Sequence, residues 1–246
     1  MKIKTRMVGL FIALSMVCGL GCSSSNCLSQ EAEYEVEDVV VQLTGSHDST
    51  LNASRSATFR MTSIRPQGIA VGTATLFSYR GKQIVVTAAH VVRGATEYFI
   101  ESRYEAGVER HLKLIYYDEV ADIAIMIPTT KIETIKPIKL RTAKSKHMYV
   151  GTKTIYSGYP NNHSMLTIHG RISGFTNDAN LILDTYGWGG ASGSSVFDEK
   201  GRLLGILSAM DVGTGLYGMP RLIPDVIIII PATKIDFEAL DILLGK

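Results

Sequence analysis

The sequence predicts an all-β protein, a barrel or a sandwich, that ends in one short helix. From Val36 onward, short runs of β-branched and aromatic residues alternate with glycine, proline, asparagine and aspartate, as in strands joined by turns. The runs recur at a spacing of roughly 8–15 residues, which is typical of antiparallel barrels and sandwiches. Only the last stretch, 232–244, places apolar residues at helical intervals.

Each predicted strand is a run of this kind between turn residues. The strands are expected, in chain order, at 36–43, 57–63, 69–79, 83–87, 97–102, 110–117, 122–127, 149–156, 164–174, 180–184, 195–197, 202–210 and 226–230. The isoleucine run 227–230 is far too short to cross a bilayer, so it is interpreted as a buried strand.

Composition excludes several classes of protein. The chain has 246 residues, of which 46% are hydrophobic and 20% charged, so it is neither disordered nor collagenous. A net charge of +2 is too small for a basic nucleic-acid-binding domain. All three cysteines lie within the first 27 residues, so the rest must fold without a disulfide, which the core of a domain of this size allows.

The N-terminal segment 1–21 is interpreted as an export signal. Lysine and arginine side chains near its start precede an apolar run that ends at about Leu20, which is the pattern of a secretory signal peptide and is too short for a membrane span. The polar segment 22–35 is expected to be a flexible tether, and 36–246 the folded domain. We therefore expect a protein exported to the periplasm or cell envelope.

Cys22 directly follows Leu20 and Gly21, an arrangement that resembles the bacterial lipobox. The resemblance implies that Cys22 carries a lipid and becomes the first residue of the mature protein. Gly19 stands where the lipobox prefers leucine, so ordinary cleavage that releases a soluble protein is the alternative. Because the signal contains basic and no acidic residues, its removal would leave the mature chain slightly acidic and would further disfavour nucleic-acid binding.

Three short segments carry candidate catalytic side chains. The segments are TAAHVV, ADIAIMIP and GGASGSSVF, which contain His90, Asp122 and Ser192. Each alone is equally compatible with a structural histidine, a turn aspartate or a glycine-rich turn. Together they provide the base, the orienting acid and the nucleophile that acyl transfer by serine requires, in the chain order His, Asp, Ser of the double-barrel serine peptidases.

These motifs resemble those of trypsin-like peptidases, and most closely the protease domain of bacterial HtrA-type (DegP-like) proteins. TAAHVV matches the family's histidine motif without change, and GASGSSVF resembles its GNSGGPLF motif. The resemblance covers about 66–235 and implies a double six-stranded β-barrel, with the barrel boundary at about 130–148 and a short C-terminal helix. We expect a stand-alone peptidase domain without the PDZ domain of HtrA proteins.

The resemblance also implies the activity, that of a serine endopeptidase. It assigns His90 as the general base, Asp122 as the acid that orients the base, and Ser192 as the nucleophile. The oxyanion would be bound by the backbone N–H groups of Gly190 and Ser192. Asp118 is a rival for the acid, but it lacks a strand that would direct it at His90.

Ser194 and Ser195 stand where the family has glycine and then proline or alanine. This departure leaves open an alternative function, in which a catalytically weak or inactive trypsin-like fold acts as a protein-binding module. Esterase activity is disfavoured, because a strand follows Ser192 where the nucleophile elbow of esterases has a helix.

The substrate pocket is expected at Tyr186, Ser208, Ala209 and Met210, the positions that the resemblance assigns to its base and wall. None of these residues is acidic, so cleavage after arginine or lysine is not expected. Tyr186 and Met210 would form a shallow apolar pocket for small or medium aliphatic side chains. The alternative is that Tyr186 belongs to the core and that the loop is shaped differently.

The expected partner is a protein or peptide substrate, with no nucleic acid, and with a membrane only through a lipid on Cys22. No cofactor is implied. His163 and His169 lack further ligands at metal spacing, so no metal site is predicted. The sequence carries no signal for an oligomeric state.

Overall fold

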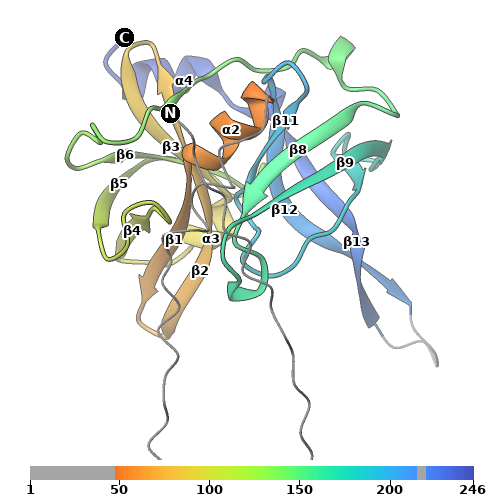
Figure 1. Ribbon diagram of the computed structural model, residues 1–246, viewed down its shortest axis with the longest axis horizontal. Helices are drawn as coiled ribbons and strands as arrows, with labels where there is room; N and C mark the ends of the chain where they lie inside the picture. Colours follow the sequence, from red (N-terminus) through yellow and green to blue (C-terminus); the bar gives the residue numbers. More distant parts are fainter. Residues whose placement is uncertain (1–47, 215–219) are drawn as a thin grey trace, which may run out of the picture.

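The computed structural model describes residues 48–214 and 220–246. The predicted signal 1–21, the tether 22–35 and the predicted strand 36–43 lie outside the described residues. The described chain forms two closed antiparallel β-barrels that lie side by side (Figure 1).

The strands of the first barrel are β1 (Thr58–Arg65), β2 (Gly68–Tyr79), β3 (Lys82–Thr87), β4 (Glu97–Glu101), β5 (Glu109–Asp118) and β6 (Ile123–Pro128). They follow the order β1-β4-β5-β6-β3-β2, and the barrel closes because β1 also pairs with β2. A short strand that the sequence did not predict, β7 (Ile138–Lys139), adds in parallel to the edge of β2.

The strands of the second barrel are β8 (Lys153–Gly158), β9 (Leu166–Phe175), β10 (Leu181–Asp184), β11 (Ser195–Asp198), β12 (Leu203–Thr214) and β13 (Pro220–Pro231). They close in the order β10-β13-β12-β11-β8-β9. The predicted fold class, an all-β double six-stranded barrel with a short C-terminal helix, is confirmed.

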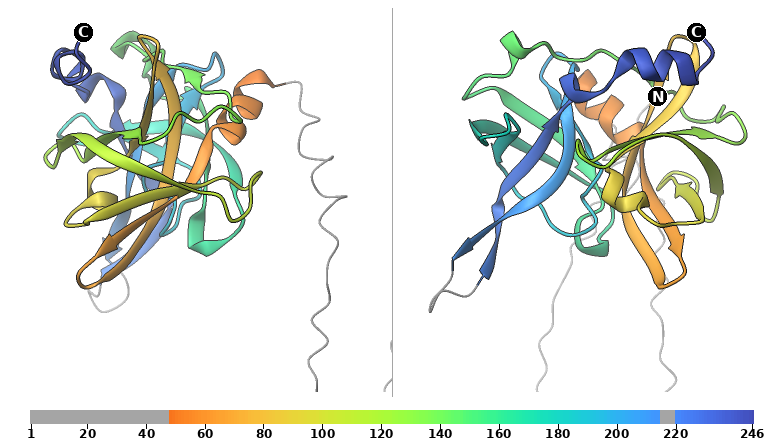
Figure 2. Two further views of the ribbon diagram at one scale, coloured as in Figure 1. Left: turned by 90° about the vertical axis from the view of Figure 1, so that its left-hand side faces the viewer. Right: turned by 180° about the vertical axis from the view of Figure 1, so that it is seen from behind.

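The hairpin of β12 and β13 is longer than the sequence predicted. We expected strands at 202–210 and 226–230, whereas the pairing continues to Thr214 and returns from Pro220. Its ladder contains two register shifts, and such irregularities break the alternation by which a strand is recognised in a sequence. Figure 2 shows this hairpin extending beyond the rest of the second barrel.

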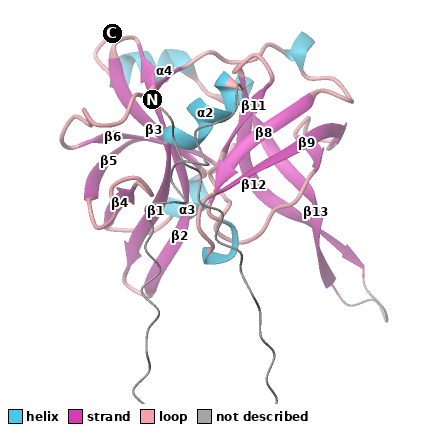
Figure 3. Ribbon diagram, viewed as in Figure 1, coloured by secondary structure: helices cyan, strands magenta, loops and turns pink. Residues whose placement is uncertain are grey.

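Helix α2 (Ser49–Ser56) was not predicted. Its buried residues are polar, so the segment lacks the apolar periodicity that marks an amphipathic helix. Asp48 caps it, because the carboxylate accepts the N–H groups of Thr50 and Leu51. In the described part of the chain the helices are few and short beside the strands (Figure 3).

The predicted C-terminal helix 232–244 is interrupted. Its first three residues form a 3₁₀ turn, and α4 (Phe237–Leu243) begins only after Asp236, whose carboxylate caps the new helix. Helix α4 returns to the first barrel, where the Tyr79 hydroxyl donates to Asp241 at 2.8 Å.

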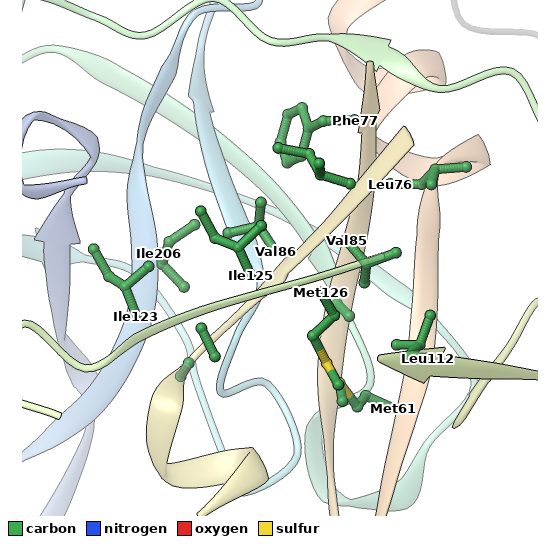
Figure 4. Packing of buried hydrophobic residues seen from close by; sticks show 14 of the residues in the cluster. Met61, Leu76, Phe77, Val85, Val86, Leu112, Ile123, Ile125, Met126 and Ile206 are labelled. Atoms are coloured by element: carbon green, nitrogen blue, oxygen red, sulfur yellow. The ribbon is translucent and has the colours of Figure 1, made fainter. Parts of the chain in front are cut away.

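The two barrels share buried apolar contacts at their interface. Ile206 of β12 belongs to the same cluster as Val86 and Ile125 of the first barrel, and the three side chains lie close together (Figure 4). The rings of Phe77 and Phe197 make another contact between the barrels, with centroids 6.0 Å apart. This continuous packing fixes the positions of the loops that meet between the barrels.

Candidate active site

His90 and Asp122 lie in contact on the first barrel. His90 is in α3 (Ala89–Val92), which follows β3, and Asp122 immediately precedes β6. Asp122 Oδ2 lies 2.8 Å from His90 Nδ1, and Oδ1 accepts the backbone N–H of His90, also at 2.8 Å. Because both carboxylate oxygens bind one residue, they fix the ring orientation and favour the tautomer with a proton on Nδ1.

Asp122 has a second partner, which sequence reasoning assigned only to the pocket. The hydroxyl of Ser208, on β12, donates to Asp122 Oδ2 at 2.5 Å. Burial raises the pKa of the Asp122 carboxyl, but hydrogen bonds from His90 and Ser208 outweigh burial, so the pKa lies below its usual value. Asp122 is therefore ionised at neutral pH. The signal in the sequence was a hydroxyl within the apolar stretch LLGILSAM.

Ser192 lies in a segment that we call the serine loop (residues 189–193), and this loop packs against the first barrel. The Ser192 carbonyl accepts the N–H of Thr73 at 2.8 Å. A Cβ on Gly193 would overlap the hydroxyl of Thr87, where β3 enters the histidine turn. In the described part of the chain the Ser192 hydroxyl makes no hydrogen bond, and catalytic hydrogen bonds often form fully only when substrate binds.

Three N–H groups of the serine loop donate no hydrogen bond within the described residues: that of Gly189 and the two predicted to bind the oxyanion, those of Gly190 and Ser192. The carbonyls of the peptide units that contain the latter two are both occupied. Gly189 O accepts the N–H of Asn161 at 2.6 Å, and Ala191 O accepts an N–H from just beyond the loop at 3.0 Å. Since C=O and N–H point in opposite directions in a trans peptide, these bonds fix the directions of the free N–H groups of Gly190 and Ser192.

Gly193→Ala is expected to lower the free energy of unfolding by on the order of 3 kcal/mol. Gly193 has a φ of +90°, and a Cβ there would overlap the Thr73 carbonyl oxygen. Urea denaturation measures the loss. The matched control is Gly189→Ala, because nothing lies within 4 Å of a Cβ there, and we expect a change below about 1 kcal/mol. Equal losses in the two variants would contradict the packing described for the loop.

Ser194 and Ser195 are buried, and within the described chain neither hydroxyl has a hydrogen-bond partner. Ser194 is accommodated by a glycine opposite it, since a Cβ on Gly158 would overlap the Ser194 hydroxyl. Ser195 still pairs with Ile206 as the first residue of β11. The two serines therefore fit the strand that follows the loop without displacing it.

Of the predicted pocket residues, Tyr186 precedes the serine loop, whereas Ser208, Ala209 and Met210 lie on β12. Tyr186 is 40% exposed, so its side chain does not belong to the core. Its carbonyl accepts the hydroxyl of the buried Tyr156, which ties this segment to β8.

Ile227, which sequence reasoning missed, occupies the space between the segment at Tyr186 and β12. It is fully buried and lies opposite Met210 across the β12–β13 ladder. A Cβ on Gly187 would overlap its Cδ1 and would lie 3.8 Å from the Tyr156 hydroxyl. The sequence gives no signal for this role, because Ile227 is one of a run of isoleucines.

Asp118, the rival acid, does not bind His90. Its carboxylate accepts the N–H of Ala121 at 2.8 Å and stabilises the turn before β6. Across residues 48–214 and 220–246, no three or more His, Cys, Asp or Glu side chains gather where they could hold a metal ion. Nor does this part of the chain contain a helix long and apolar enough to span a bilayer.

A family model described as the trypsin-like peptidase domain matches residues 72–206, more than half of the chain. The chain belongs to this family. The match includes His90, Asp122 and Ser192 and confirms the family that the motifs predicted. Trypsin-like peptidases are serine endopeptidases, and the protein is assigned to that class. No curated protein matches the chain in sequence.

Solved structures of bacterial proteases share the fold. The active form of the Rv3671c protease from M. tuberculosis gives a TM-score of 0.58 at 19% identity, over 76% of this chain and 81% of that one. The serine endoprotease from Yersinia pestis gives 0.63 at 18% identity, over 82% and 67%. The HtrA-type protease AlgW, with a tripeptide, gives 0.61 at 20% identity, over 80% of this chain and 62% of AlgW. At these identities the likeness establishes the fold alone.

Proposed function

We propose that this protein hydrolyses peptide bonds within proteins or peptides by acylation of Ser192. The observation that carries the proposal is the double contact of the Asp122 carboxylate with the ring and the backbone N–H of His90. A serine hydroxyl is a weak nucleophile and needs a base of near-neutral pKa held in one tautomer. With its Nδ1 proton donated to Asp122, His90 presents an unprotonated Nε2 for that task.

In the acylation step, His90 Nε2 takes the proton of the Ser192 hydroxyl as Oγ attacks the substrate carbonyl carbon. The imidazolium that forms is stabilised by Asp122, whose lowered pKa keeps its carboxylate ionised. The oxyanion accepts the free N–H groups of Gly190 and Ser192, each of which stabilises the transition state by about 3–4 kcal/mol. His90 then gives its proton to the leaving amine as the C–N bond breaks. In the second half of the reaction, water attacks the acyl group on Ser192 with His90 again as the base, and the carboxylic acid product leaves as the bond to Oγ breaks and Oγ regains its proton.

A fluorophosphonate probe tests this proposal, because it reacts only with an activated serine. The folded wild-type protein should be labelled and should hydrolyse internally quenched peptides, and heat-unfolded protein should do neither. A folded sample that does neither, with circular dichroism showing intact β-structure, would overturn the enzymatic proposal in favour of a protein-binding module.

We further propose that the pocket accepts only small aliphatic side chains at the residue before the cleaved bond. The argument rests on Ile227, which fills the space beside Gly187. Met210 lies opposite Ile227 on the neighbouring strand and narrows the same space. The Tyr156 hydroxyl holds the Tyr186 carbonyl, so the segment cannot move outward to enlarge the pocket without breaking a buried hydrogen bond.

Ile227→Ala is expected to raise the ratio of kcat/KM for phenylalanine over alanine at that substrate position by about 10- to 100-fold, the range that a few methylene groups control in an apolar pocket. Peptides that differ only at that position measure the ratio. Ile172→Ala is the matched control, because Ile172 is buried in the same cluster and its loss should affect stability alone. An unchanged ratio in Ile227→Ala, or an equal rise in Ile172→Ala, would contradict the assignment.

We also propose that the protein is exported and anchored by a lipid on Cys22, which lies outside the described residues. The proposal is supported by the basic and apolar regions of segment 1–21 and by the position of Cys22 after Gly21. In a bacterial host, the wild-type protein should fractionate with membranes and Cys22→Ala should not. Cys27→Ala is the control and should stay with the membranes. A soluble wild-type protein in the periplasm would favour ordinary signal cleavage.

A further inference from the structure

Thr73 contacts the serine loop at two points, although it belongs to β2 of the other barrel. Thr73 is fully buried. Its N–H donates to the Ser192 carbonyl at 2.8 Å, and its hydroxyl donates to the Gly190 carbonyl, also at 2.8 Å. Thr73, a residue of the first barrel, thus holds the carbonyls of Gly190 and Ser192, the two residues whose free N–H groups are proposed to bind the oxyanion.

The Thr73 hydroxyl is also an acceptor. It receives the N–H of Tyr159 at 3.1 Å, and the 3₁₀ turn that follows contains Asn161, whose N–H holds Gly189 O. The Thr73 carbonyl accepts the hydroxyl of Thr87 at 2.8 Å, at the end of β3. Thr73 therefore connects three parts of the site: the serine loop, the turn that supports its first peptide, and the strand that leads to the histidine turn.

The serine loop needs such support, because Gly189 and Gly190 give its backbone unusual freedom. Gly190 has a φ of +95°, and glycine can leave that conformation without a steric penalty. A rotation of the peptide between these two residues would exchange the free N–H of Gly190 for the Gly189 carbonyl oxygen. A carbonyl oxygen at that point would repel a developing oxyanion where the N–H group would bind it.

We propose that the Thr73 hydroxyl is a positioning group that keeps the serine loop in its oxyanion-binding conformation. The inference rests on the proposed function and extends it to a residue that touches neither substrate nor the reacting atoms. The hydroxyl acts by donating to Gly190 O and accepting from Tyr159 N, and a methyl group in its place can do neither.

The test compares Thr73→Val, which removes the hydroxyl, with Thr73→Ser, which keeps it. Thr73→Val should lower kcat by about 10- to 100-fold, which is at most the fall in kcat expected when one oxyanion-binding group is removed. KM should change little, because the pocket is untouched. Thr73→Ser should retain the wild-type kcat. Thr75→Val is the matched control, since Thr75 is buried on the same strand and its hydroxyl has no hydrogen-bond partner in the described chain.

Crystal structures of the Thr73→Val and Thr75→Val variants provide a readout that does not depend on activity. The serine loop should be rearranged in the first and unchanged in the second. Should Thr73→Val not fold, Thr73→Ala removes the same hydroxyl and is compared in the same way. A loss of kcat in Thr73→Ser as large as that in Thr73→Val would overturn the proposal. So would a wild-type kcat together with an unmoved serine loop in the variants that lack the hydroxyl.

The two proposals fail in different ways. If the wild-type protein does not react with the fluorophosphonate probe while the loop of Thr73→Val is rearranged, the proposed function fails and the positioning role of Thr73 stands. If the wild-type protein is active and the variants equal it in both kcat and loop structure, the positioning role alone fails.

Discussion

Replacing Ser192 with alanine is expected to lower kcat for peptide hydrolysis by about 10⁶-fold, the size of the loss when a serine peptidase loses its nucleophile. The N–H groups of Gly190 and residue 192 persist in the variant, so a residual rate of about 10³–10⁴-fold over the uncatalysed reaction should survive. KM should stay near the wild-type value, because the backbone contacts of the loop do not involve the hydroxyl. Steady-state kinetics with a quenched peptide measure both constants.

Ser145→Ala is the control for this variant. Ser145 is an exposed serine on the 3₁₀ turn Ser145–His147, so its hydroxyl can be removed without touching the site. The control should equal the wild type in kcat and in melting temperature. Wild-type activity in Ser192→Ala would contradict the assignment of the nucleophile.

Asp122→Asn is expected to lower kcat at neutral pH by about 10⁴-fold. An asparagine side chain cannot accept at both of its polar atoms, so the contacts with the ring and backbone of His90 cannot both persist. The neutral asparagine side chain also stabilises the imidazolium form of His90 less than a carboxylate does. Asp118→Asn is the matched control, because Asp118 supports a nearby turn without contacting His90. An equal loss in both variants would indicate damage to the fold in place of a role for Asp122.

The lowered pKa of Asp122 also predicts a pH dependence of stability. A carboxyl whose pKa is lower in the folded than in the unfolded state stabilises the fold above its unfolded pKa of about 3.9. That stabilisation is lost as the pH falls through the lower folded value. The difference in unfolding free energy between the wild type and Asp122→Asn should therefore shrink as the pH falls below about 4. Urea denaturation across pH 3–7 measures it, and a difference independent of pH would contradict the ionised state.

The barrels could be predicted from the sequence because their strands alternate with turn residues and carry motifs that resemble a known family. Helix α2 could not, because it buries Ser54 and Arg55, and helix prediction depends on apolar periodicity. The C-terminal helix was predicted too long, because the capping carboxylate of Asp236 starts a new helix within a continuous apolar pattern.

The candidate site could be predicted in part, since the motifs single out His90, Asp122 and Ser192, and His90 lies in contact with Asp122. It was not predictable where the role depends on a neighbour far away in the sequence. Ser208 binds Asp122 across 86 positions of the chain, and Ile227 is one isoleucine in a row of them. Such roles arise from strand register and barrel packing, which no local pattern specifies.

Identification of the residue that carries the fluorophosphonate adduct tests the central claim most directly. The labelled wild-type protein is digested, and tandem mass spectrometry locates the added mass within the segment that contains the serine loop. We expect the adduct on Ser192 alone, and much slower labelling in Asp122→Asn. An adduct on the neighbouring Ser194 or Ser195, or no adduct on a folded wild-type protein, would contradict the account of Ser192 as a nucleophile activated by His90 and Asp122.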